Sequence, residues 1–255
     1  MIFTRFLPGV LKELMKHVPT VLFKAVEWSD LASEFPKITK RILSKEGYQD
    51  LFDSQSSILG NLGVKLIESR PEANTFPDKD RAGEEILTIY FTQLLSPHGV
   101  FLDLRIQYFN QTEENLHWSP SPLWTRFSDT FSVGLIEVYD GFYFSEDEKF
   151  RQGLAKIGLL SLDWKDSDQA ELCNLFRSHF GAAADEKMSF RLEDLQKSII
   201  NMANFLLERK VTINKDFLYL GINLVTMYST LESIGSNVCV AKIYKDLREK
   251  LHPRL

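Results

Sequence analysis

The chain has 255 residues, 44% of them hydrophobic, which is enough to bury the core of one large domain or two small ones and excludes bulk disorder. Its formal net charge of -5 at pH 7 argues against a general nucleic-acid-binding protein, which would show a basic excess or a basic face. No run of about 18 apolar residues occurs, so the sequence predicts no membrane-spanning helix.

The first 24 residues are basic and amphipathic, unlike the acidic remainder of the chain. Their apolar residues recur at helical spacing, which predicts a helix after Pro8. Such a segment could lie on an anionic membrane, act as an organelle presequence, or dock on its own domain or on a partner. The residues expected to contact a membrane or a partner are Phe3, Arg5, Phe6, Val10, Lys12, Leu14 and Lys16.

The pattern divides the chain into an N-terminal helical segment (1–53), a connector (54–80) and a helical domain (81–255). The connector is rich in Ser, Gly, Asn and Pro, and a short helix is predicted in it from Leu62 to Glu68. Either Asp78 or Asp80 can cap the next helix, which is expected to end before a proline at position 97.

Two short stretches further along indicate β structure. Apolar and polar residues alternate over Leu102–Tyr108, which is typical of a half-buried strand, and Val133–Val138 is a short apolar run followed by the turn residues Asp140-Gly141. Ser145 and Glu148 have the spacing of a capping box, which predicts that a helix begins at Ser145.

The remainder of the chain is predicted to be helical. Helices are expected to begin near Asp168, Ser189 and Asn214, and a last helix carries apolar residues over Val240–Leu247. Cys173 lies in one of these helices, and it and the second cysteine, at position 239, are expected to be packed thiols in a reducing compartment. The predicted fold class is therefore mainly α with a small β element.

Three stretches in order resemble motifs of the UbiB/AarF family, the atypical kinase-like proteins of ubiquinone biosynthesis. VPTVLFKAVEW, with Lys24 and a following Phe35-Pro36, is similar to the family's GPxxIKLGQW motif. Ile89–Phe101 is similar to the helix that leads into the catalytic loop, and GLIEVYDGFYFSEDEKFR resembles GLIDFGMVGRLSEEER. The resemblance implies the C-terminal lobe of a UbiB-type kinase fold from Glu85 onward.

The departures from the family pattern concern the catalytic residues. Against the family's HxDPHPGN loop, Leu104 occupies the aspartate position, and the DFG-like triplet becomes Glu137-Val138-Tyr139. Between Asp50 and Glu85 there is no room for a nucleotide-binding lobe with its phosphate loop and strand lysine. Phosphoryl transfer depends on positioning and electrostatic clamping, so the loss of these groups predicts a protein that is not an enzyme.

The resulting hypothesis is a catalytically inactive UbiB-like pseudokinase remnant, a scaffold or accessory subunit of a larger protein assembly. The usual location of the family and the basic amphipathic start suggest that the protein belongs to a mitochondrial inner-membrane complex, such as the respiratory chain or ATP synthase. The alternative location is the cytoplasm. A membrane surface or lipid is a further expected partner, and no cofactor, metal or nucleic acid is expected. The alternatives are a lipid- or quinone-binding module, or a residual ATPase or kinase that uses Glu137 and Asp103.

Overall fold

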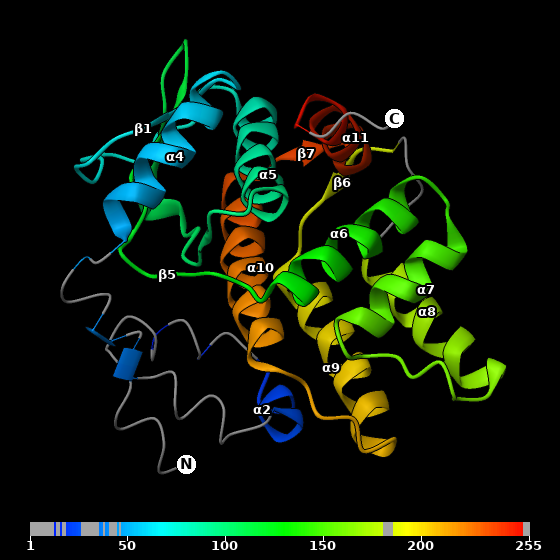
Figure 1. Cartoon of the computed structure of the whole chain (residues 1–255). Coiled ribbons are helices and arrows are strands. Elements are labelled where there is room, and N and C mark those ends of the chain that lie inside the picture. Colours follow the sequence, from blue (N-terminus) through cyan, green and yellow to red (C-terminus); the bar gives the residue numbers. More distant parts are fainter. Residues whose placement is uncertain are drawn as a thin grey trace.

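The computed structural model describes residues 13, 16, 19–26, 36–37, 39–40, 45, 47–180 and 186–251, without the side chain of residue 23. These residues are mainly helical with small β-sheets, so the predicted fold class is confirmed at that level (Figure 1). The helices are α2 (Leu22–Ala25), α4 (Tyr48–Gly60), α5 (Lys79–Leu95), the short 3-10 helix η2 (Ile106–Tyr108), α6 (Asp129–Tyr143), α7 (Asp147–Lys156), α8 (Asp166–Phe180), α9 (Leu192–Glu208), α10 (Lys215–Ile234) and α11 (Val240–Leu251).

The strands are short, and most of them pair with a strand that is distant in sequence, β3 and β4 being the neighbouring pair. In one sheet, β4 (Leu116–Trp118) lies between β1 (Val64–Leu66), which is parallel to it, and β3 (Phe109–Gln111), which is antiparallel. Two further antiparallel pairs join β2 (Val100–Phe101) to β5 (Trp124–Thr125) and β6 (Met188–Ser189) to β7 (Asn237–Val238).

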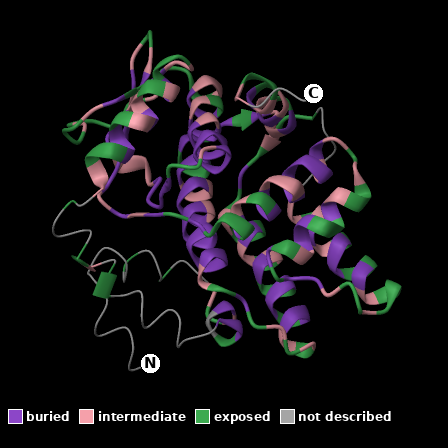
Figure 2. Cartoon of the chain, viewed as in Figure 1, coloured by how far each residue is buried: buried purple, intermediate pink, exposed green. Residues whose placement is uncertain are grey.

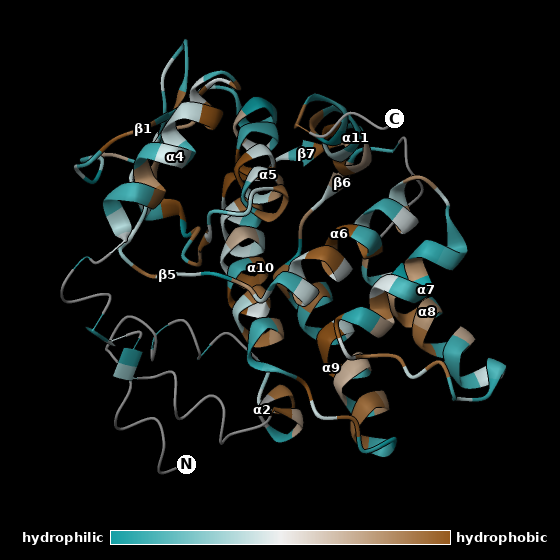
Figure 3. Ribbon diagram, viewed as in Figure 1, coloured by the Kyte–Doolittle hydropathy of each residue, from teal (hydrophilic) through white to brown (hydrophobic). Residues whose placement is uncertain are grey.

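Helix α10 is the central element of the core. Residues on most of its faces are buried, as expected for a helix that other elements surround, and α5 and α9 pack directly against it (Figures 1 and 2). Helix α11 packs on α5, while α8 lies against α9. Helix α7 packs on α6 at the surface, where Figure 3 shows mostly hydrophilic residues along α7.

Several predicted helix ends are confirmed by their caps. The Asp78 carboxylate accepts a hydrogen bond from the Arg81 backbone N–H at 3.0 Å, so it caps α5, and α5 ends at Leu95 as expected. The side chain of Asn214 caps α10 by accepting from the Phe217 N–H at 3.2 Å. At the other end of α10, a glycine with φ of 74° adopts the left-handed conformation that commonly ends helices.

The predicted strand Val133–Val138 and the turn at Asp140-Gly141 are wrong, because both lie inside α6. A short apolar run has no period that separates a strand from a buried helix. The glycines serve close packing instead: a Cβ on Gly141 would stand 2.4 Å from the backbone nitrogen of Phe150 in α7. Gly134 lies two turns earlier on the same helical face, and there too α7 is too close to leave room for a side chain.

The predicted capping box at Ser145 and Glu148 is also wrong. Ser145 has a φ of 59°, and the N-cap of α7 is Glu146, whose side chain makes no capping hydrogen bond. The backbone N–H of Ser145 instead donates to the Phe142 carbonyl at 3.3 Å, which closes the end of α6. The tight turn between two packed helices therefore determines this backbone conformation.

Two further predictions fail because distant residues determine the local structure. Leu102–Tyr108 is not a strand: residues 102–105 have no regular secondary structure and the chain then forms η2, while the neighbours Asp103 and Leu104 are both fully buried. The predicted helix Leu62–Glu68 contains β1, whose parallel partner β4 lies far along the chain. The division into segments 1–53, 54–80 and 81–255 remains a prediction, although residues 53 and 54 both lie within α4.

Candidate functional site

Polar side chains of α10 hold the backbone of Phe101–Leu104, which we call the anchored segment. The amide Nδ2 of Asn223 donates to the Phe101 carbonyl at 2.8 Å, and the hydroxyl of Thr230 donates to the Leu104 carbonyl at 2.6 Å. Between them, the hydroxyl oxygen of Thr226 accepts from the Leu104 N–H at 3.1 Å. Because these three side chains share one helical face and are almost fully buried, α10 fixes the course of the segment through its backbone.

The anchored segment carries one carboxylate, and that carboxylate is already paired. Asp103 is fully buried, and its two oxygens accept from Nε and Nη2 of Arg105 at 2.8 and 2.7 Å. The hydrogen bond to Asp103 raises the pKa of the Arg105 guanidinium, so the cation persists at any ordinary pH. The bidentate pair leaves Asp103 badly placed to act as a base or to bind a metal.

Glu137, the other acid of the predicted catalytic pair, lies on a different element. It sits in α6 and forms an ion pair with Lys156 of α7. Each acid thus has its own cationic partner. Among the described residues, no group of three or more His, Cys, Asp or Glu side chains is arranged to hold a metal ion.

Asp140 is a buried charge whose role the sequence did not reveal, because it was predicted to lie in a turn. Its carboxylate accepts from the Tyr244 hydroxyl at 2.7 Å and from Arg248 Nε at 3.0 Å, and Lys149 Nζ lies 3.0 Å away. Burial raises the pKa of Asp140, but the hydrogen bonds from Arg248, Tyr244 and Lys149 outweigh it and hold the pKa below its ordinary value. Asp140 therefore remains ionised and joins α6 to α7 and α11.

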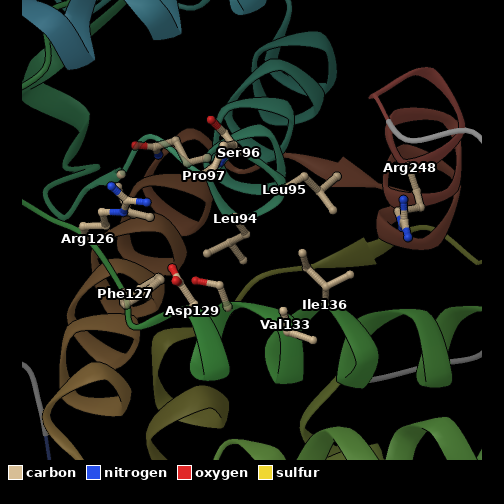
Figure 4. A pocket seen from close by; sticks show the side chains of 14 residues that line it. Leu94, Leu95, Ser96, Pro97, Arg126, Phe127, Asp129, Val133, Ile136 and Arg248 are labelled. Carbon is tan, nitrogen blue, oxygen red and sulfur yellow. The ribbon is translucent and has the colours of Figure 1, made fainter.

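A second candidate site is an open groove of about 500 Å³ between the C-terminal end of α5 and the first half of α6, which we call the α5–α6 groove. Its floor is apolar, and Arg126 and Arg248 lie at opposite ends of it (Figure 4). Val133 is 50% exposed there. The apolar residues that Figure 4 shows between the arginines are Leu94, Leu95, Val133 and Ile136.

One polar side chain in the wall of this groove is incompletely bonded. Gln93 is fully buried, and its Oε1 accepts from the Phe101 N–H at 2.7 Å. Its Nε2 has no hydrogen-bond partner among the described residues. A buried donor without a partner is costly, so this atom weakens the local packing free energy unless a neighbouring group shifts to accept from it.

Two further titratable groups have shifted pKa values outside the groove and the anchored segment. Burial lowers the pKa of His179 to about 4, and its Nδ1 lies 3.0 Å from the Ser198 hydroxyl. Two small spaces of about 30 Å³ adjoin His179, and each has room for about one water molecule. Burial raises the pKa of Glu85 to about 7 although Arg81 Nε lies 3.7 Å from it.

The predicted membrane or partner contacts Phe3, Arg5, Phe6, Val10, Lys12 and Leu14 lie outside the described residues. Lys16 is described and exposed, and it forms an ion pair with Glu13 at 3.0 Å. Within the described ranges, no helix combines the length and hydrophobicity that crossing a bilayer requires. Cys173 is buried and the cysteine at position 239 is partly buried, and neither forms a disulfide within the described ranges.

A scan against protein-family models and a search of curated proteins return no match to this chain. The UbiB/AarF resemblance therefore remains a prediction from the motifs in the sequence.

Proposed function

We propose that the chain is a catalytically inactive, UbiB-like pseudokinase remnant that acts as a scaffold or accessory subunit, in a mitochondrial inner-membrane complex such as the respiratory chain or ATP synthase. The observation that carries this proposal is the anchored segment. Five of its backbone groups are held by Gln93 and α10, yet it presents no free catalytic side chain. Leu104 is fully buried, and the carboxylate of Asp103 is bound to Arg105.

The order of the elements around the anchored segment supports the same proposal. In the kinase lobe that the resemblance implies, a helix leads into the catalytic loop, and a short strand pair separates this loop from the metal-binding segment. Here α5 precedes the anchored segment, β2 shares Phe101 with it, and the pair β3 and β4 follows it. The metal-binding position that the sequence alignment assigns is Glu137-Val138-Tyr139, which lies within α6, and Glu137 is paired with Lys156. Neither this position nor the anchored segment then offers a free carboxylate for Mg²⁺.

The scaffold role is tested by purifying the tagged endogenous chain from gently solubilised mitochondrial membranes. We expect it to migrate with one membrane complex on native gels and to recover the subunits of that complex in fixed proportion. A chain that migrates as a free monomer in every detergent, with no subunit enriched over a tag-only control, would contradict the proposal.

The inactive state is tested separately by thermal shift with ATP, with and without Mg²⁺. A nucleotide at about 100 times its Kd would stabilise the chain by about 2.7 kcal/mol, and we expect no such shift. Asp103→Asn is the matched variant, because the ATPase alternative depends on this carboxylate. An Mg²⁺-dependent shift or ATP hydrolysis that Asp103→Asn abolishes would favour a residual enzyme instead.

A further inference from the structure

The α5–α6 groove exposes apolar side chains beside a cation that no described residue neutralises. Val133 is 50% exposed, whereas Leu94 and Leu95 below it are almost fully buried. Arg126 is exposed, and it forms no ion pair or side-chain hydrogen bond in the described part of the chain. Single exposed hydrophobic residues are ordinary at protein surfaces. An apolar floor that ends at an unpaired cation, however, matches a ligand with an apolar chain and a charged head group.

The lining of the groove contains charges of both signs. Arg126 and Arg248 stand against one acid, Asp129, in the lining. Arg248 is already committed to Asp140, so Arg126 is the cation available to a ligand. It lies just before the first turn of α6, where the positive end of the helix dipole adds to its charge.

The buried amide of Gln93 leaves one donor unsatisfied beside the groove. Its Nε2 is enclosed in the groove wall and has no partner among the described residues. The volume of about 500 Å³ lies in the range of small-molecule sites.

We propose that the α5–α6 groove binds the monomer of a single-chain amphiphilic anion, a fatty-acyl carboxylate. The carboxylate is held by Arg126, and the chain lies over Val133 and Ile136 towards Arg248 (Figure 4). This site does not depend on the scaffold proposal, since the isolated chain can bind an acyl anion whether or not it joins a complex.

The test is calorimetric titration of the purified full chain with hexanoate, octanoate and decanoate, each below its micelle concentration. Affinity should rise with chain length by up to about fourfold per methylene, and decanoate should bind more tightly than decylamine. Equal affinity for the three acids, or a preference for decylamine, would overturn the proposal.

Two variants locate the site, each with a matched control. Val133→Asp changes a half-exposed residue, so the fold is retained, and it should weaken decanoate binding at least tenfold. Leu162→Asp makes the same change at a residue that is 61% exposed outside the groove and should leave binding unchanged. Equal losses in both variants would indicate general detergent-like adsorption and would refute the site.

Arg126→Gln should reduce the affinity for decanoate about tenfold and leave the affinity for decanol unchanged, because only the charge contact is lost. Arg151→Gln removes an exposed charge outside the groove and is the control. Sedimentation velocity tests whether a second copy of the chain occupies the groove instead. If wild type is a dimer that Val133→Asp disrupts, and decanoate does not bind, the groove is a dimer interface and the acyl-anion proposal fails.

Discussion

The close packing of α6 on α7 predicts that Gly141→Ala destabilises the protein. A Cβ at this position would lie 2.4 and 2.5 Å from the backbone nitrogen and Cα of Phe150. Backbone atoms cannot rotate away as a flexible side chain can, so α7 must move. Overpacking of this kind costs about 1–3 kcal/mol, and the better helix propensity of alanine returns at most about 1 kcal/mol. We expect a net loss of about 2 kcal/mol.

Gly221→Ala is the matched control, since Gly221 also lies within a buried helix. A Cβ there would meet Leu22 Cδ2 at 3.8 Å, an ordinary contact, so the propensity gain should dominate and stabilise the protein by up to about 1 kcal/mol. Urea denaturation followed by far-UV circular dichroism measures both variants, with an unchanged m-value as the requirement for comparison. A Gly141→Ala midpoint equal to or above wild type would refute the close approach of α6 and α7.

Four further substitutions test individual contacts. Asp140→Asn removes the anion shared by two cations and should cost about 3 kcal/mol in urea denaturation. Thr226→Val keeps the shape but leaves the Leu104 N–H unsatisfied, so it should cost about 1–3 kcal/mol and speed hydrogen exchange at that amide. Glu85→Gln should stabilise the protein at pH 8, by at most about 3 kcal/mol, and leave it unchanged at pH 4. Wild type should lose stability as the pH falls from 6.5 to about 4, because the buried imidazole of His179 resists protonation, and His179→Phe should remove this loss.

Helix ends could be predicted where one local signal determines them. Asp78 and Asn214 each place a side-chain oxygen before an amphipathic stretch, and each caps a helix in the structure. The strands could not be predicted in this way. Val64–Leu66 becomes a strand because Leu116–Trp118 lies beside it, and neither segment contains information about the other's position.

The error over Val133–Val138 has a specific cause. A run of apolar residues followed by Asp-Gly favours a strand and a turn when it is considered alone. The alternative is that a glycine within a helical pattern has a packing role, and the spacing of seven between Gly134 and Gly141 is consistent with one helical face. The structure follows this alternative, and Lys156 and Ile157 of the α7 end occupy the space that the first glycine leaves.

The same error concealed the α5–α6 groove. Its residues come from three separate parts of the chain, and its apolar pair, the exposed Val133 and the partly buried Ile136, has the i, i+3 spacing that only a helix presents on one face. In a strand these two residues would point to opposite faces. A helix predicted over these residues would have placed both on one face and so indicated an apolar surface. The arginine at position 248, in contrast, could be assigned to the groove only from the fold.

The shifted titrations of Glu85 and His179 act in opposite directions over one pH range. The folded pKa of Glu85, about 7, lies above its unfolded value of 4.5, so its contribution to stability falls as the pH rises between these values. The folded pKa of His179, about 4, lies below 6.5, so its contribution is present above pH 6.5 and is lost as the pH falls towards 4. Between pH 4.5 and 6.5 the two slopes, each at most about 1.4 kcal/mol per pH unit, largely cancel. Wild type should therefore show a flat profile there, Glu85→Gln a rising one and His179→Phe a falling one. Parallel profiles for the three proteins would show that neither group is desolvated as the structure indicates.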